Sequence, residues 1–379
     1  MEQKIGILLP RSDMFPTLAM DFLNGLKMAF KNSMLSEFQL IYIIEGIGNA
    51  SNNDVIKAAE KMLLQENVDI TIAFCGSHIL SDLVGIFNNY KKPLIHVDLG
   101  GNMLKPEHVS PYVLHHSLNL CHSAYLAGTY AAKTFGKKAM MAASIYDGAY
   151  HHTHSFVEGY TSQGGTVTNF YVAPMDYKAE TYDKMMEGIE REAPDVVFGL
   201  FSYKEGQKVF DILANSKFNG KIPFMVIPTM ADETINTENY KLQDIYSIAS
   251  WAFDDSRPAM KEFVSEYAAN YSEKVNIIAL LGYEVGQTIT KCLLDTNSIP
   301  KNIKETFQNK HIDSPRGPLS YNARNESQIP SHAVRRFRFN ETSYHNDVLE
   351  LIDNSQEEDL YFKFDEVPYS GWQNPYICT

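Results

Sequence analysis

The sequence lacks most of the patterns that tie a chain to a membrane or to cysteine chemistry. No window holds about 18 consecutive apolar residues, so we expect no transmembrane helix. The four cysteines, Cys75, Cys121, Cys292 and Cys378, lie far apart and form no Cys-x-x-Cys pair. Neither a zinc ribbon nor a thioredoxin-type redox site is therefore indicated.

Positive charge is also scarce. The chain has 33 Lys and Arg against 46 Asp and Glu, a formal net charge of −13. The only compact basic run, Arg335-Arg336-Phe337-Arg338, is too short to outweigh this acidic balance. Because nucleic-acid binding needs clustered Lys and Arg, we expect no nucleic-acid partner.

Nucleotide and acyl-transfer motifs are missing too. A G-x-G-x-x-G should follow the first strand of a dinucleotide-binding domain, but here Pro10-Arg11-Ser12-Asp13 follows, with no glycine until Gly25. No G-x-x-x-x-G-K-[ST] and no G-x-S-x-G nucleophile elbow occurs. The sequence therefore predicts no cofactor and no enzymatic activity.

Histidines gather at two places, His115-His116 and His151-His152-Thr153-His154. Helical spacing would put His151 and His154 side by side, but no H-E-x-x-H is present. A zinc site needs ligands on one face with supporting acceptors behind them, so a solvated helix start is the favoured interpretation and no metal is predicted.

The composition, by contrast, provides for large cores. It is 44% hydrophobic, with 22 Tyr and 21 Phe, which excludes disorder of the whole chain. At about 150 residues per domain, 379 residues indicate two or three domains, or one fold in two lobes.

Short apolar runs alternate with segments of helical spacing. We predict strands at 4–9, 39–44, 69–74 and 93–97, and helices at 17–32, 53–65 and 79–89. A second series predicts strands at 139–144, 166–171, 195–200 and 223–227, and helices at 119–134, 152–162, 179–190 and 205–215. This order predicts an α/β fold of two doubly wound parallel-sheet lobes.

After residue 246 the alternation breaks. We predict a strand at 246–251 and long helices at 258–271 and 277–295. The stretch 310–321 is dense in turn formers, strands are expected at 332–339 and 346–351, and the closing 361–379 segment is expected to be ordered.

Polar residues follow the predicted strands where ligands bind in open α/β sheets, beyond the carboxyl ends of the strands. Ser77 precedes a helix, so we expect it to be a helix N-cap rather than a nucleophile. The free amides of such a helix start suit an anion. The candidate ligand-binding residues are Gly76, Ser77, His78, Asp98, Gly100, Tyr150, Ser202 and Thr229.

The chain resembles the type I periplasmic binding proteins of the branched-chain amino-acid (Leu/Ile/Val) class, the ligand-binding proteins of ABC importers. The matching segments, which run in the family's order, are 4–10 (KIGILLP), 22–29 (FLNGLKMA), 92–95 (KPLI), 131–138 (AAKTFGKK), 146–150 (YDGAY), 193–197 (APDVV), 281–284 (LGYE) and 314–318 (SPRGP). We interpret these motifs as mostly structural. Gly25 would let the first helix approach the sheet, and Pro93 would open a strand.

The resemblance implies two lobes joined by a three-strand hinge, with crossovers near Leu118, near Trp251 and between Tyr321 and His332. Lobe 1 would comprise residues 1–118 and 252–325, and lobe 2 residues 119–251 and 326–379. Closure of the hinge would then bury the ligand between the lobes.

The resemblance also implies the ligand contacts. The loops after the third and fourth strands match Gly76, Ser77 and His78, and then Asp98 and Gly100. Lobe 2 contributes a tyrosine matching Tyr150 and a residue matching Ser202.

Two positions depart from the family pattern. Amino-acid binders place an acidic residue after the following strand to pair with the ammonium, whereas this chain has Thr229-Met230 there and Asp232 and Glu233 slightly later. Asp98 stands where a small or hydroxyl residue is usual. An acid there could replace the ammonium partner or bind a different donor.

The favoured function is therefore a solute-binding protein that captures a small polar metabolite, an amino acid or other carboxylate, for a permease in the membrane. It would be periplasmic or otherwise extracytoplasmic, with a leader removed. One alternative is a ligand-sensing regulatory protein of the same fold. Another is a hydrolase or metal enzyme using His78, Asp98 and the histidines at 151–154.

Overall fold

The computed structural model describes residues 2–33, 35, 37–354, 357–370 and 376, so Cys378 and most of the segment after 370 lie outside the described residues. The chain divides into two compact units. Unit 1 comprises 1–118, 257–330 and 358–379, and unit 2 comprises 119–256 and 331–357. We had expected residues 326–379 in the second lobe. Instead 326–330 and 358–379 group with unit 1, so the chain passes between units a fourth time, at 357/358.

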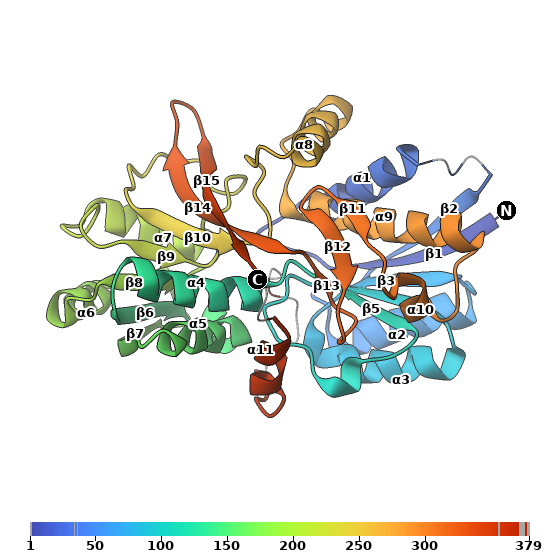
Figure 1. Cartoon of the computed structure of the whole chain (residues 1–379), viewed down its shortest axis with the longest axis horizontal. Coiled ribbons are helices and arrows are strands. Elements are labelled where there is room, and N and C mark those ends of the chain that lie inside the picture. The colour runs from blue at the N-terminus through green and yellow to red at the C-terminus, as the bar shows by residue number, and fades with distance from the viewer. Residues whose placement is uncertain (1, 34, 36, 355–356, 371–375, 377–379) are drawn as a thin grey trace. The chain divides into compact units, whose positions relative to one another are not determined.

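Unit 1 is built on a five-stranded, wholly parallel sheet of order β2-β1-β3-β4-β5. Its strands are β1 Glu2–Leu9, β2 Gln39–Gly46, β3 Ile70–Phe74, β4 Leu94–Val97 and β5 Val113–His116. Its main helices are α1 Leu18–Lys31, α2 Asn52–Leu64, α3 Leu80–Tyr90, α8 Pro258–Tyr271 and α9 Ile277–Thr296. Helices α1 and α9 lie on one face of the sheet and α2 and α3 on the other (Figure 1). All residues of β3 are buried and all but Thr71 are apolar, which is typical of a parallel strand covered on both faces.

Local sequence signals set where these helices begin. The Ser51 side chain accepts a hydrogen bond from the Asp54 amide and caps α2. The Asn276 side chain accepts the Ile278 and Ala279 amides at 3.1 and 3.0 Å and caps α9. Pro258 stands at the first position of α8, where its missing N–H leaves no hydrogen bond unmade.

Helix α9 is, among the described residues, the one helix long and apolar enough by composition to cross a membrane. However, 72% of its most apolar window is buried inside the protein, as in the core helix of a globular domain. It packs along α1, where Gly25 of α1 and Gly282 of α9 bring the two backbones together. We had predicted that Gly25 lets the first helix approach the sheet. The structure shows that Gly25 faces a helix instead.

The last part of unit 1 differs from the sequence prediction. The stretch rich in turn formers contains a hairpin, and the closing segment begins with a helix. The elements are α10 Ile303–Phe307, β11 Ile312–Ser314, β12 Gly317–Tyr321, β13 Ser327–Gln328 and α11 Glu357–Phe364. Strands β11, β12 and β13 form a small antiparallel sheet.

Unit 2 contains a seven-stranded sheet of order β15-β14-β10-β9-β8-β6-β7. Its strands are β6 Lys138–Ser144, β7 Thr166–Ala173, β8 Val196–Leu200, β9 Phe224–Val226, β10 Ile245–Ala249, β14 Ser331–Phe339 and β15 Tyr344–Asp353. Strands β6 to β10 are parallel, whereas β14 and β15 are antiparallel to their neighbours. The predicted parallel sheet is confirmed for β6 to β10, and an antiparallel pair of strands extends it at one edge. A hairpin can extend a sheet without a crossover helix, and β14–β15 does so here.

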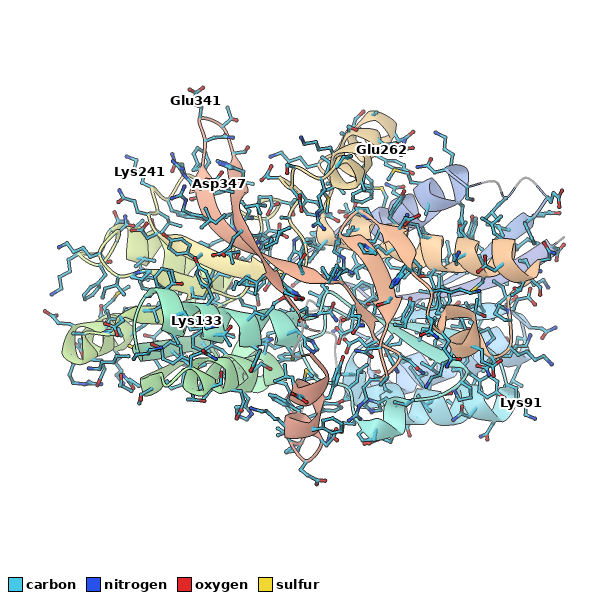
Figure 2. The ribbon with its side chains drawn as sticks, in the orientation of Figure 1. Lys91, Lys133, Lys241, Glu262, Glu341 and Asp347 are labelled. Atoms are coloured by element: carbon cyan, nitrogen blue, oxygen red, sulfur yellow. The ribbon has the colours of Figure 1, made fainter. Side chains whose placement is uncertain are left out.

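The helices of unit 2 are α4 Leu120–Thr134, α5 His151–Ser162, α6 Asp183–Glu192 and α7 Tyr203–Ala214. Helices α4 and α5 run together along one face of the sheet (Figure 1). Gly128 and Gly159 make their crossing close, as Gly25 and Gly282 do in unit 1. Charged side chains such as Lys133, Lys241 and Glu341 are exposed (Figure 2).

Candidate functional site

The candidate residues of unit 1 follow adjacent strands. The Cys75 amide donates to the Val97 carbonyl and the Asp98 amide to the His116 carbonyl, both at 3.2 Å. The ladder thus continues past β3, β4 and β5 and brings Gly76, Ser77, Asp98 and Gly100 to one edge of the sheet. Gly100 has φ +80°, a left-handed conformation that glycine adopts without strain.

Ser77 is 2% exposed, and its Oγ has no hydrogen-bond partner among the residues that the structure describes. Gly76, not Ser77, is the N-terminal cap of the short 3₁₀ turn Ser77–Ile79 that leads into α3. The expected N-cap role of Ser77 is therefore wrong. A buried hydroxyl without a partner costs free energy, on the order of 1–3 kcal/mol, unless a ligand or water satisfies it.

His78 lies next to Ser77 but is committed to a protein partner. Its Nε2 is 2.6 Å from Asn52 Oδ1, at the start of α2. Burial lowers the pKa of His78 to about 4, so the ring is neutral at pH 7. His78 therefore supplies no positive charge to this edge of the sheet.

Asp98 is 5% exposed, and its Oδ1 accepts the Leu99 amide at 2.7 Å. Burial raises the pKa of this carboxyl to about 7; the Leu99 amide lowers it and the Glu326 charge raises it further. Asp98 is thus a buried acid with a raised pKa, a property it shares with Glu233 of unit 2 and one that is frequent at functional sites.

Three buried histidines, His96, His108 and His115, make hydrogen bonds next to these strand ends. His96 Nε2 lies 2.9 Å from the Cys75 carbonyl oxygen, and His96 Nδ1 lies 3.3 Å from His115 Nδ1. His115 Nε2 in turn lies 3.0 Å from the His108 carbonyl oxygen. Burial lowers the pKa of all three rings, so they act as neutral hydrogen-bonding groups.

The histidines noted in the sequence at 115–116 and 151–154 do not form one cluster. His115 lies against His96, its neighbour His116 lies against Glu284, and His151 and His152 belong to unit 2. Within the part of the chain that the structure describes, no three His, Cys, Asp or Glu side chains are grouped so that they could hold a metal ion.

In unit 2, Ser202 follows β8 and is held by Asp147. Asp147 Oδ2 accepts the Ser202 amide at 2.9 Å, and Asp147 Oδ1 accepts the Ser202 hydroxyl at 2.7 Å. Ser144 Oγ also donates to Asp147, at 2.6 Å. The Ser202 hydroxyl is thus turned back toward Asp147 and does not cap α7. Tyr150 precedes α5, and its hydroxyl donates to that of Tyr146 at 3.0 Å.

We predict that Asp147→Asn lowers the stability of unit 2 by about 1.5–3 kcal/mol, the range for hydrogen bonds to a charged group. The amide nitrogen would meet either the Ser202 amide or a hydroxyl that now donates. Thermal unfolding followed by circular dichroism measures the change. Asp176→Asn, on an exposed side chain of the same unit, is the matched control and should change the melting temperature little. Equal stability of the two variants contradicts the assigned role of Asp147.

Thr229 is fully buried after β9, and Asp232 and Glu233 follow it. Asp232 Oδ1 accepts the Thr234 amide at 2.7 Å, and Asn346 donates to Glu233 at 2.6 Å. Burial raises the pKa of Glu233 to about 7, and the Asp232 charge acts in the same direction.

Arg335 is fully buried in the middle of β14. Its guanidinium lies 5.0 Å from the Trp251 ring centroid and donates to Ser247 Oγ and the Pro228 carbonyl at 3.1 and 3.3 Å. Arg336 and Arg338 instead pair with Asp347. The basic run noted in the sequence therefore does not form a basic surface patch.

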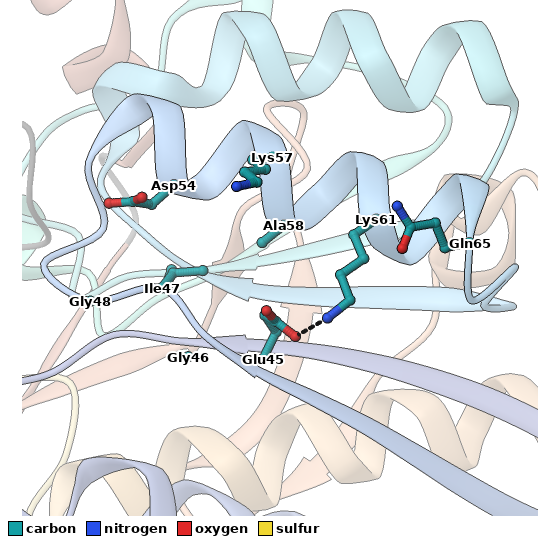
Figure 3. A pocket seen from close by; sticks show the side chains of 9 residues that line it. All are labelled: Glu45, Gly46, Ile47, Gly48, Asp54, Lys57, Ala58, Lys61 and Gln65. Atoms are coloured by element: carbon teal, nitrogen blue, oxygen red, sulfur yellow. Dashed lines mark hydrogen bonds and ion pairs between the residues drawn. The ribbon is translucent and has the colours of Figure 1, made fainter.

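A groove of about 480 Å³ runs beside α2 in unit 1, and none of its lining residues is a predicted binding residue. Figure 3 shows its charged wall, where Lys61 and Glu45 form an ion pair of 2.7 Å. Both partners are more than a third exposed, so the pair contributes little stability. The lining residues are Glu45, Gly46, Ile47, Gly48, Asp54, Lys57, Ala58, Lys61 and Gln65.

Sequence reasoning missed a fully buried charge network in unit 1. Arg316 Nε and Nη2 donate to Glu284 Oε1 and Oε2 at 2.8 and 2.7 Å, and His116 Nε2 lies 3.0 Å from Glu284 Oε2. Ser314 Oγ also donates to Glu284. Glu284 belongs to the segment LGYE quoted above and Ser314 and Arg316 to SPRGP, but nothing in the sequence showed that these segments meet each other or His116.

The family profile of the periplasmic binding proteins matches residues 2–343. The chain therefore belongs to the periplasmic binding protein family, and its α/β architecture of two units is the type I form of that fold. No curated protein sequence matches the chain.

Solved structures share this fold over nearly the whole chain. An ABC transporter substrate-binding protein from Sphaerobacter thermophilus is 19% identical, with TM-score 0.82 over 93% of this chain and 98% of that chain. A solute-binding protein of an ABC transporter from Rhodopseudomonas palustris, in complex with 3,4-dihydroxybenzoic acid, is 17% identical, with TM-score 0.77 over the same shares. A leucine-binding protein from Thermotoga maritima is 15% identical, with TM-score 0.67 over 93% of this chain and 99% of that chain.

Proposed function

We propose that the chain is the solute-binding protein of an ABC importer and that it captures a small carboxylate-bearing solute. It would deliver this solute to a permease from an extracytoplasmic location. Membership of the periplasmic binding protein family supports this proposal, as does the fold shared with solute-binding proteins of ABC transporters.

We propose that the strand-end residues of both units carry the binding. In unit 1 they are Gly76, Ser77, His78, Asp98 and Gly100, and in unit 2 they are Tyr150, Ser202 and Thr229. The observation that carries the proposal is a pair of buried polar groups at the carboxyl edge of a parallel sheet: the Ser77 hydroxyl, which has no partner among the described residues, and Asp98, which accepts from one donor. Ligands of open α/β sheets bind at that edge, and a ligand would satisfy groups that the described residues leave unpaired.

Two solute classes are supported by the similar structures. Proteins from R. palustris are bound to 3,4-dihydroxybenzoic acid, 4-hydroxybenzoate or benzoate, whereas others bind leucine or isoleucine. Aromatic carboxylates and amino acids are therefore the first solutes to test with this chain.

A thermal-shift screen of the full chain tests the proposal, with these five compounds as probes. A solute at 100 times its Kd should stabilise the protein by about 2.7 kcal/mol. Ser77→Ala should weaken binding of any hit about tenfold or more, whereas Glu60→Gln, on an exposed face of α2, should leave it unchanged. The proposal fails if no probe shifts the melting temperature and mass spectrometry of the purified protein finds no bound solute.

A further inference from the structure

We propose that Asp98 makes the site select solutes that present a hydrogen-bond donor, a hydroxyl or an ammonium group, to unit 1. This inference rests on the proposed function and names the solute class of the same site. It follows from what surrounds the Asp98 carboxylate and from what is missing there.

The first observation is that Asp98 accepts little from the protein. Oδ1 takes the Leu99 amide, and among the described residues no other hydrogen bond reaches the carboxylate. With the side chain 95% buried, the acid has lost water without gaining a full set of donors. Ser77 Oγ is also buried at this edge and has no hydrogen-bond partner among the described residues. A ligand bound there could form hydrogen bonds with both the Asp98 carboxylate and the Ser77 hydroxyl.

The second observation is the absence of a cation. Within the described part of the chain, no Lys, Arg or His forms an ion pair with Asp98. His78 is neutral and committed to Asn52, and His96 is neutral and committed to the Cys75 carbonyl. Arg316 is engaged by Glu284, and Arg324 by Asp365. The charged group that affects the pKa of Asp98 is Glu326, whose charge has the same negative sign.

These surroundings distinguish between ligand groups. Once Asp98 is ionised, above its pKa of about 7, a ligand carboxylate placed against it would face a like charge without a screening cation, which disfavours binding. A hydroxyl or ammonium group would instead donate to the free lone pairs of the carboxylate, and the Ser77 hydroxyl could accept or donate beside it. A solute such as 4-hydroxybenzoate fits this edge by its hydroxyl group, and an α-amino acid such as leucine fits it by its ammonium group.

The size of the preference follows from hydrogen-bond energetics. A hydrogen bond to a charged group is commonly worth about 10- to 100-fold in affinity. A solute lacking the donor should lose that factor, because Asp98 is then left buried and unpaired. Loss of the charge at position 98 should remove the preference rather than the binding.

Matched pairs of probes test this. Isothermal titration of the full chain would compare 4-hydroxybenzoate with benzoate and leucine with 4-methylpentanoate, whose members differ only in the donor group. We expect the donor-bearing member of the pair that binds to be at least tenfold tighter. In Asp98→Asn the ratio should fall to within about threefold, and Asp98→Ser serves as a second neutral variant if the first folds poorly. Glu60→Gln should keep the wild-type ratio.

The outcomes separate the two proposals. If the probes bind but the ratio is near one, or if it survives in both Asp98 variants, the inference is wrong and the solute-binding function stands. If no probe binds and no solute co-purifies, both are overturned. The apoprotein melting temperature gives an independent readout. Removing a buried acid that lacks a cation should leave it unchanged or raise it, whereas a structural role for Asp98 would lower it.

Discussion

Glu284→Gln is expected to destabilise unit 1 by about 3–5 kcal/mol, the range for breaking one partner of a buried ion pair. Glu284 and Arg316 are both 0% exposed and share two hydrogen bonds. A neutral amide would leave the guanidinium buried without a counter-charge. It would also mispair with Ser314 and His116, which both lie within hydrogen-bond reach of the carboxylate.

Urea unfolding followed by fluorescence and circular dichroism measures this loss. Glu45→Gln is the matched control, since it breaks the half-exposed pair with Lys61 and should cost no more than about 1 kcal/mol. A double variant, Glu284→Met with Arg316→Met, should cost less than Glu284→Gln alone, because no uncompensated charge remains. If Glu284→Gln and Glu45→Gln behave alike, the network does not stabilise the fold.

The same residue gives stability a defined pH dependence. Burial by itself would raise the pKa of Glu284, but the Arg316 charge and the hydrogen bonds from His116 and Arg316 lower it to about 2. The pKa of a glutamate in the unfolded chain is near 4.5. Because the folded pKa is the lower one, the contribution of Glu284 is complete above about pH 4.5 and is lost as the pH falls toward 2. Glu284→Gln should flatten the acid limb of the stability curve over that window.

Periodicity in the sequence was enough to predict most of the elements that carry the site. The runs that became β1, β3 and β4 are mostly apolar, and every residue of β3 and β4 is buried, as is typical of parallel strands covered on both faces. The helix predicted at 258–271 matches α8, whose start is marked by Pro258. Where periodicity and a terminal signal agree, the prediction is confirmed.

The elements that were missed carry weaker signals. Strand β5 has four residues, and two of them are His115 and His116, which look polar although both are buried against partners far away in the chain. The β11–β12 hairpin contains Pro315 and Gly317, which signal a turn but not the strands beside it. A strand this short has no measurable period, so tertiary contacts decide it.

Positions at the site were easier to predict than pairings. Strand ends followed from the alternation of elements, which placed Ser77, Asp98 and Ser202 after β3, β4 and β8. The hydrogen bonds between Asp147 and Ser202 join residues that are 55 positions apart. No pattern in the sequence, including the histidines at 151–154, predicted this pairing. The roles of Ser77, Asp98 and Ser202 in ligand binding remain predictions until a ligand is identified.

The second large effect is expected at the crossing of α1 and α9. A Cβ on Gly25 would lie 2.0 Å from the Ala279 carbonyl oxygen, and one on Gly282 would lie 2.1 Å from the Phe22 carbonyl oxygen. Both obstacles are backbone atoms, so no rotamer change relieves the overlap and the helices must move apart. Overpacking of this kind costs about 1–3 kcal/mol or more, and we expect Gly25→Ala to fall at or above the upper end.

The matched control is Gly85→Ala in α3, where no atom lies within 4 Å of the added methyl group. Alanine there should stabilise the protein by about 0.5–1 kcal/mol, because glycine is the poorer helix former. The two substitutions are chemically identical and both lie inside helices of unit 1, so opposite signs in urea unfolding isolate the steric term. If Gly25→Ala is also stabilising, α1 and α9 do not approach as closely as the structure has them, and the packing assigned to this side of the sheet is wrong.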